Sequence, residues 1–176
     1  MEPVERIAEG HVQLLQIRWE RVDEPELLRR AEVPGMAWTA RGGAAPARPL
    51  DVQLARDLPA VVGDRVQLQQ VVLNLILNGV EAAGAVAEGP RELVVSSETD
   101  AGKGVLVSVR DTGGGFDEAK ASRLFDAFFT TKPGGLGMGL AISRSIVESH
   151  RGRIWAAPNS PRGAVFRFTV PVLATA

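Results

Sequence analysis

The sequence predicts an α/β (α+β) fold, a two-layer sandwich in which helices cover one face of a mixed β-sheet. Two long segments, 64–86 and 137–150, have the apolar spacing of helices. Five short segments show the alternation or β-branched content of strands. Along the chain the order is strand, helix, strand, strand, insert, helix, strand, strand. This order lacks the regular alternation of a doubly wound sheet.

The strands and helices of this domain follow from local patterns. In the first strand Leu50, Val52 and Leu54 alternate with polar residues, and Asp64 is a capping residue that opens the first long helix. The second long helix carries an apolar side and ends before a glycine. The strands are expected at 50–55, 92–98, 104–111, 153–157 and 163–171.

Residues 1–49 differ in composition and in apolar spacing from the rest of the chain. Residues 1–33 have helical apolar spacing, whereas 34–49 are rich in Gly, Ala and Pro, which is typical of a linker. We place the boundary there, so that 1–49 form a helical segment with a linker and 50–176 form the main domain.

The composition excludes several classes of protein. The 176 residues are 45% hydrophobic and 23% charged with a formal net charge of -1, so there is no basic field for nucleic acid or an anionic membrane. The absence of cysteine excludes disulfides and thiolate metal sites. No apolar run approaches the roughly 18 residues that span a bilayer. We expect a cytoplasmic protein, or the cytoplasmic part of a longer one.

Polar residues form a stripe along the otherwise apolar first helix. Their separations of 3, 4, 4 and 3 residues put them on one face. The stripe either faces water or faces a ligand, and two asparagines one turn apart favour the ligand because Asn is a poor helix former. Its members are Gln67, Gln70, Asn74, Asn78 and Glu81.

Asp111 ends a strand in which Val105, Val107 and Val109 share its parity. Its carboxylate is therefore expected at the core side of the sheet, where it must accept hydrogen bonds. Two interpretations stay open. The acid could bind the amides of its own turn, or it could hold a flat donor such as a purine amine beside close-approach glycines.

A second glycine cluster, "GGLGMG", leads directly into the second long helix. It is either an ordinary flexible loop or an anion site in which helix N-terminal amides meet phosphates. Between the two clusters lies the insert "RLFDAFFTTK" (residues 123–132), whose Phe125, Phe128 and Phe129 are expected to pack it onto the body of the domain. Thr130, Thr131 and Lys132 offer hydroxyls and a cation beside the second cluster.

In this order the motifs resemble the catalytic ATP-binding domain of bacterial sensor histidine kinases, over roughly Leu50 to Pro171. The motifs are the Asn-containing helix, "DTGGG", the Phe-containing insert, "GGLGMG" and a last glycine before a strand. The wider group includes gyrase, mismatch-repair and chaperone ATPases, and its Bergerat-type fold implies a mobile ATP lid. The sequence of residues 132–156 is most similar to that of the nitrogen-regulation and oxygen-sensing type of sensor kinase.

The resemblance implies roles for individual residues. It implies that Asn78 is an Mg²⁺ ligand, that Asn74 is near the nucleotide and that Glu81 is beside the metal or its waters. Asp111 is implied to accept from the adenine amine of ATP or ADP. The remaining implied nucleotide contacts are Gly113, Gly115, Phe125, Thr131, Lys132, Gly135, Leu136, Gly137, Gly139 and Leu140. Asn74, Asn78 and Lys132 form the implied catalytic set.

One position bears on the chemistry. Hydrolysing members of the group have a glutamate one turn before the metal-binding asparagine, where it activates water. This chain has Asn74 there, and an amide cannot act as a general base. The resemblance therefore implies a domain that holds MgATP without rapid hydrolysis. Phosphoryl transfer to a histidine would then rely on positioning and charge stabilisation.

The phosphoacceptor of the family is a histidine on a dimerising helical hairpin, followed by an acid and a proline. The chain has two histidines, and neither fits. His150, at the end of the second long helix, is interpreted as structural, and His11 has no adjacent acid and no following proline. We expect a fragment, or a protein that acts on a histidine domain of another chain and so feeds a response regulator receiver domain. The N-terminal helix would be a remnant of the hairpin or would form a homodimer.

Three functions follow for comparison. The first is the ATP-binding half of a protein-histidine kinase. The second is a non-catalytic adenine-nucleotide sensor or adaptor, which the missing phosphoacceptor favours. The third, a hydrolysing ATPase, is disfavoured by Asn74.

Overall fold

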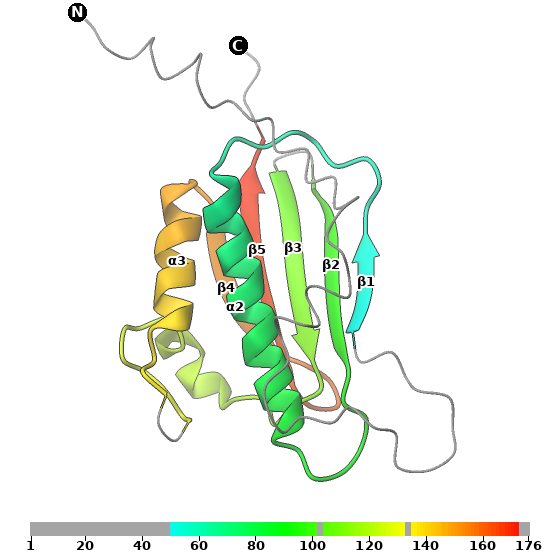
Figure 1. The fold of residues 1–176 in the computed structure, drawn as a ribbon, viewed down its shortest axis with the longest axis vertical. Coiled ribbons are helices and arrows are strands. Elements are labelled where there is room, and N and C mark those ends of the chain that lie inside the picture. Colours follow the sequence, from blue (N-terminus) through cyan, green and yellow to red (C-terminus); the bar gives the residue numbers. More distant parts are fainter. Residues whose placement is uncertain (1–49, 102–103, 133–134, 173–176) are drawn as a thin grey trace, which may run out of the picture.

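The computed structural model describes residues 50–101, 104–132 and 135–172, which form a mixed five-stranded sheet with helices on one face (Figure 1). The predicted order of elements and the predicted fold class are both confirmed. The strands are β1 (Leu50–Leu54), β2 (Leu93–Asp100), β3 (Gly104–Asp111), β4 (Arg153–Pro158) and β5 (Ala164–Pro171). The helices are α2 (Arg65–Gly84), the 3₁₀-helix η2 (Glu118–Arg123) and α3 (Gly139–Ser149).

The sheet has the strand order β1-β2-β3-β5-β4. Its first pair, β1 and β2, is parallel and connected through α2, whereas the other three pairs are antiparallel. The helices α2 and α3 lie side by side on the sheet and contact each other (Figure 1). The end of β3, which carries the first glycine cluster, and the start of α3, which carries the second, therefore belong to two layers that both pack against α2.

Helix α2 begins where the sequence predicts. Asp64 is its N-cap, and the Asp64 carboxylate accepts from the backbone N–H groups of Val66 at 2.8 Å and Gln67 at 3.1 Å. Such a cap contributes about 1 kcal/mol. Many apolar residues of α2 are buried in the core, among them Val71, Leu75 and Ile76, whereas Val66 near its start is exposed.

The core lies between the helices and the sheet. In β3 the valines at 105, 107 and 109 are buried, and the sheet register pairs them with Val170, Phe168 and Phe166 of β5. Asp111 continues the same parity and is only 2% exposed. The inward orientation of this acid was predicted from the alternation and is confirmed.

The strand signal of Val52 is confirmed, although Val52 is 43% exposed and only the first residue of β1 is buried. One expectation about apolar residues was wrong. Phe128 is 76% exposed with a positive φ of 66°, so it does not pack the insert onto the body. Phe125 does so, since it is buried and meets the ring of Phe166 at 6.4 Å between centroids.

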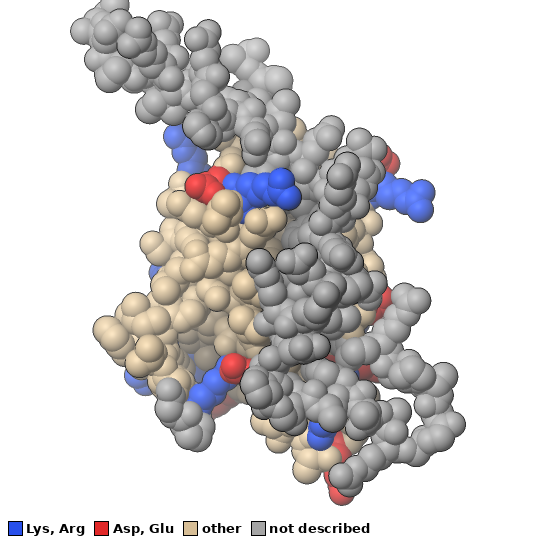
Figure 2. Space-filling view, in the orientation of Figure 1, with Lys and Arg blue, Asp and Glu red and all other residues tan. Residues whose placement is uncertain are grey.

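The helix-covered face carries scattered acidic and basic side chains, and no extended area of one sign is seen over its described residues (Figure 2). No helix within the described ranges is both long and apolar enough to cross a bilayer. The expectations about the N-terminal helix, its linker and His11 fall outside the described residues.

Candidate functional site

A cavity of about 380 Å³ opens between the C-terminal half of α2, the insert and the start of α3. It brings together most of the residues that the sequence predicted to bind phosphates and metal. Those residues are Asn78, Glu81, Thr131, Lys132, Gly135, Leu136, Gly137, Gly139 and Leu140. Leu124, Phe129, Thr130 and Met138 complete the lining.

The polar stripe of α2 divides into parts with different surroundings. Asn78 and Glu81 line the cavity, whereas Gln67 and Gln70 are exposed. Asn74 does not line the cavity. Its Nδ2 donates weakly to the Gly139 carbonyl at 3.5 Å and to Ser143 Oγ at 3.4 Å, so it joins α2 to the first turn of α3.

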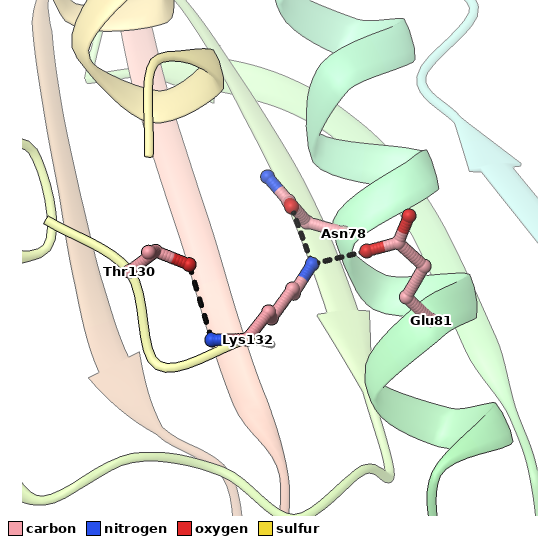
Figure 3. Close-up of polar contacts among 4 residues, drawn as sticks. All are labelled: Asn78, Glu81, Thr130 and Lys132. Atoms are coloured by element: carbon pink, nitrogen blue, oxygen red, sulfur yellow. Dashed lines mark hydrogen bonds and ion pairs between the residues drawn. The ribbon is translucent and has the colours of Figure 1, made fainter. Parts of the chain in front are cut away.

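Lys132 connects the insert to α2 across the cavity (Figure 3). Its Nζ donates to Asn78 Oδ1 at 2.9 Å and forms an ion pair with Glu81. The backbone N–H of Lys132 donates to Thr130 Oγ1 at 3.1 Å. The cation is thus held by two side chains of one helix face and by its own segment.

The oxygens around Lys132 fit a hard divalent cation. Asn78 Oδ1 and the Glu81 carboxylate converge on one positive charge, and amide and carboxylate oxygens are the ligands that Mg²⁺ prefers. Within the described part of the chain there is no group of three or more His, Cys, Asp or Glu that could hold a metal. A metal here would therefore complete its coordination with water and phosphate oxygens.

Asp111 is buried at the end of β3. Its Oδ1 accepts from the N–H groups of Gly113 at 2.8 Å and Ala164 at 3.3 Å. No described residue donates to Oδ2. Burial raises the pKa of Asp111 above its ordinary value, although these two bonds and the positive charge of Lys132 act in the opposite direction.

The first interpretation of Asp111 is met, because Oδ1 accepts from the amide of its own turn. The second, that Asp111 holds a flat donor such as a purine amine, stays a prediction, and no described residue occupies Oδ2. Asp111 does not itself line the cavity described above, so the residue predicted to bind adenine and the residues predicted to bind phosphate do not share one cavity in this structure.

Gly113 and Gly115 allow close packing of the backbone at the end of β3. A Cβ on Gly113 would lie 2.6 Å from the carbonyl carbon of Ala82 in α2. Gly115 has a φ of 68°, and a Cβ there would lie 2.8 Å from the Gly163 carbonyl oxygen. The space beside these glycines is filled by protein, and neither glycine lines the cavity. Their contribution to the site is to hold β3 against α2 and the start of β5.

The second cluster does reach the cavity. Gly137 has a φ of 67°, and the Gly137 carbonyl accepts from the N–H of Phe128 at 3.1 Å. Helix α3 begins at Gly139 without a side-chain cap. Its first N–H groups and the positive end of its dipole are therefore available to an anion in the cavity.

Sequence reasoning missed two supporting residues. Asn159 Nδ2 donates to the Asp111 carbonyl at 2.8 Å, and buried Ser143 donates to the Gly139 carbonyl at 3.0 Å. Asn159 lies in a polar loop with no periodicity, which gave no signal. Ser143 could have been found as a polar residue one turn after Gly139 on the apolar side of the helix.

A family model described as histidine kinase-, DNA gyrase B-, and HSP90-like ATPase matches residues 63–174. The sensor protein FixL of Bradyrhizobium diazoefficiens is 48% identical over 133 residues, which are 73% of this chain and 26% of that protein. The sensor histidine kinase TmoS of Ectopseudomonas mendocina is 45% identical over 124 residues, or 70% of this chain and 13% of TmoS. The chain thus spans about a quarter or less of these two relatives.

Solved structures show the same architecture. The catalytic domain of the histidine kinase ThkA in a nucleotide-free form has a TM-score of 0.59 at 35% identity, covering 70% of this chain and 80% of that one. Full-length ShkA in complex with AMPPNP has a TM-score of 0.60 at 29% identity, covering 72% and 27% of the two chains.

Proposed function

The chain belongs to the family of histidine kinase-, DNA gyrase B- and HSP90-like ATPases, and we propose that it binds MgATP and donates the γ-phosphoryl group to a histidine on a separate domain. The family match over residues 63–174 and the similarity to sensor proteins support the proposal that this domain is the ATP-binding catalytic part of a sensor histidine kinase. The observation that carries the proposal is the cavity itself. It combines an uncapped helix N-terminus, a lysine and two metal-type oxygens.

In this proposal the phosphates lie between the start of α3 and Lys132. The first amides of α3 donate to phosphate oxygens, and the ammonium of Lys132 neutralises their charge. Asn78 and Glu81 hold Mg²⁺ or its waters on the opposite side of the cavity. The bound metal would supply charge neutralisation for the transferred group.

The adenine end is proposed to meet Asp111. Its Oδ2 receives no hydrogen bond from the described residues, while Oδ1 is fixed by two backbone amides. A purine exocyclic amine is a flat donor that suits such an acceptor. The packing of Gly113 against α2 and the bond from Asn159 to the Asp111 carbonyl keep this carboxylate in place.

The proposed reaction is transfer rather than hydrolysis. Asn74 stands one turn before Asn78, and its side chain is directed to Gly139 and Ser143 of α3. An amide in this place cannot remove a proton from water. The site would then hold the γ-phosphoryl group until a nucleophile arrives in line.

The nucleophile is proposed to be a histidine on a helical hairpin domain, and the phosphoryl group would pass on to a response regulator receiver domain. We propose a cytoplasmic site of action, where ATP and Mg²⁺ are abundant. FixL is named a sensor protein and TmoS a sensor histidine kinase, and both are several times longer than this chain, which supports a role as one part of such a protein.

The test uses ATP labelled at the γ-phosphate. The chain is mixed with separately made hairpin domains of its relatives, and label is expected on the hairpin histidine. Because phosphohistidine is labile to acid and stable to alkali, this label should survive alkaline treatment of the gel and be lost in acid. Asn78→Ala is expected to abolish transfer. Tight nucleotide binding without transfer to any hairpin would contradict the kinase proposal and favour a nucleotide sensor.

A further inference from the structure

Lys132 is bound to the two side chains that the proposed function gives to the metal. Its Nζ donates to Asn78 Oδ1 at 2.9 Å and pairs with Glu81 (Figure 3). Both are acceptor oxygens, and both come from the same face of α2. The positive charge of the insert therefore lies at the oxygens that a divalent cation would use.

The ion pair between Lys132 and Glu81 is open to exchange with cations in solution. The side chain of Lys132 is 42% exposed and that of Glu81 is 49% exposed, so water and ions reach both groups. An ion pair of this exposure is weak and sensitive to salt. The Lys132 backbone N–H donates to Thr130 Oγ1 within its own segment, a bond that does not involve the ammonium and can persist when the ammonium leaves Glu81.

We propose that Lys132 is an internal counter-cation of the metal position, and that its ammonium and Mg²⁺ compete for Asn78 Oδ1 and Glu81. The two cations cannot share these oxygens, because like charges repel at such short range. Arrival of the metal frees Lys132 to bind phosphate in the same cavity. This inference rests on the proposed function and adds a rule of specificity to it.

The competition predicts that the site binds a nucleotide without Mg²⁺ less well than one with it. A nucleotide without Mg²⁺ could attract Lys132 only by taking it from Glu81, which would leave that carboxylate unpaired beside the phosphate charges. Mg²⁺ removes this conflict because it takes over Glu81 as the lysine departs. The exchange therefore makes the site favour metal-bound nucleotide over free nucleotide.

The scarcity of lysine makes the exchange measurable. Lysine occurs only at positions 103, 120 and 132. Trace acetylation of the amines with acetic anhydride at constant pH, read by mass spectrometry, reports the availability of each one. Lys120 is the internal reference, since its side chain is 54% exposed and its only described ion pair, with Asp117, is long at 3.9 Å.

In EDTA and without nucleotide, Lys132 of the wild-type chain is expected to react about two- to fivefold more slowly than in Glu81→Gln, the range that an exposed ion pair allows. Asn78→Ala should raise its reactivity less. The matched control is Glu148→Gln, which removes a similarly exposed ion pair with Arg144 on α3 and should leave Lys132 unchanged.

Mg²⁺ is then titrated without nucleotide, with sodium chloride keeping the ionic strength constant. Lys132 of the wild-type chain should approach the reactivity seen in Glu81→Gln, while Lys120 stays constant and Glu81→Gln does not respond. Equal reactivity of Lys132 in wild type and Glu81→Gln, or slow reaction throughout the titration, overturns the competition.

Calorimetry with ADP separates this inference from the proposed function. If Mg²⁺ releases Lys132 but ADP does not bind, the competition stands and the proposed function fails. If ADP binds with Mg²⁺ but Lys132 never responds to the metal, the nucleotide site stands and the competition fails.

Discussion

At the scale of single residues, the buried charge of Asp111 lowers the stability of the fold, whereas the same carboxylate is proposed to bind adenine. Burial disfavours its charge, yet the proposed adenine contact needs an acceptor. We predict that Asp111→Asn leaves the fold intact, because the amide Oδ1 can still accept from Gly113 and Ala164. It should also raise the free energy of unfolding at neutral pH, because the buried charge is removed. Urea unfolding measures this change.

The same substitution should weaken ADP binding by about ten- to a hundredfold, as expected when a hydrogen bond to a charged acceptor is lost. Calorimetry gives the affinity. Unchanged affinity would remove Asp111 from the nucleotide site, whatever happens to the stability.

The pH dependence of stability follows from the same carboxyl group. Its pKa in the folded chain is raised above the ordinary value of 3.8. The folded state therefore binds more protons than the unfolded state between these two values, so stability falls as pH rises through that window. The stability advantage of Asp111→Asn over wild type should accordingly grow from pH 4 to pH 7. Urea midpoints of the two proteins at each pH provide the check, and an advantage that shrinks with rising pH would contradict it.

Gly163 packs closely against the backbone of Asp111 at the end of β3. Its φ is 101°, and a Cβ there would collide with the Asp111 carbonyl oxygen. We predict that Gly163→Ala lowers the free energy of unfolding by more than about 1 kcal/mol and also weakens ADP binding. The matched control is Gly114→Ala, where an added Cβ meets nothing within 4 Å. Equal effects of the two substitutions on urea midpoints would show that the close approach at Gly163 is unimportant.

What the sequence could predict at this scale depended on periodicity. The alternation of β3 predicted the inward position of Asp111, and the helical spacing of α2 predicted that Asn78 and Glu81 share a face. No pattern indicated that Lys132 would pair with them, because the partners are 51 residues or more apart in sequence. Phe128 was misjudged because its side chain was assigned by residue type, whereas its positive φ directs it outward.

At the scale of elements, His150 joins the end of α3 to the start of α2. Its Nε2 accepts from the N–H of Asp64 at 2.8 Å, and Nδ1 is 2.7 Å from the Ile146 carbonyl. The neutral tautomer that carries hydrogen on Nδ1 satisfies both bonds. This geometry agrees with the structural role expected for His150.

We predict that His150→Phe lowers the free energy of unfolding by about 1 kcal/mol, because the N–H of Asp64 loses its partner. Hydrogen exchange should increase at Asp64 and in the first turn of α2. The Ser149 hydroxyl lies 3.2 Å from His150 Nδ1, so the control is instead Glu148→Gln, which removes the exposed ion pair with Arg144 on the same helix. Unchanged exchange at Asp64 in His150→Phe would contradict the proposed link.

The elements themselves were predicted nearly to their ends. Both long helices and all five strands occur within about two residues of the expected bounds, because capping and alternation are local signals. The pairing of β3 with β5, which brings Ala164 to Asp111, is not local and was not predicted. The adenine end of the site depends on that pairing.

At the scale of the whole molecule, the proposed ligand contacts four segments that are far apart in sequence. The phosphates and metal would touch α2, the insert and α3, and the adenine would touch β3. A ligand that binds the folded chain alone raises its stability by RT ln(1 + [L]/Kd), which is about 2.7 kcal/mol at a hundredfold excess over Kd. Because the contacts join separate elements, the whole domain should gain this stability in one cooperative transition.

We therefore predict that ADP with Mg²⁺, at a hundredfold excess over Kd, raises Tm by roughly 10 °C, taking about 4 °C for each kcal/mol in a domain of this size. ADP in EDTA should raise it much less, because Lys132 then remains on Glu81. Asp111→Asn at the same ADP concentration should shift less than wild type, and Glu148→Gln should shift equally. Differential scanning calorimetry at several ADP concentrations makes the comparison. An equal rise with and without Mg²⁺ would mean that the metal, and with it the oxygens of Asn78 and Glu81, takes no part in holding the nucleotide.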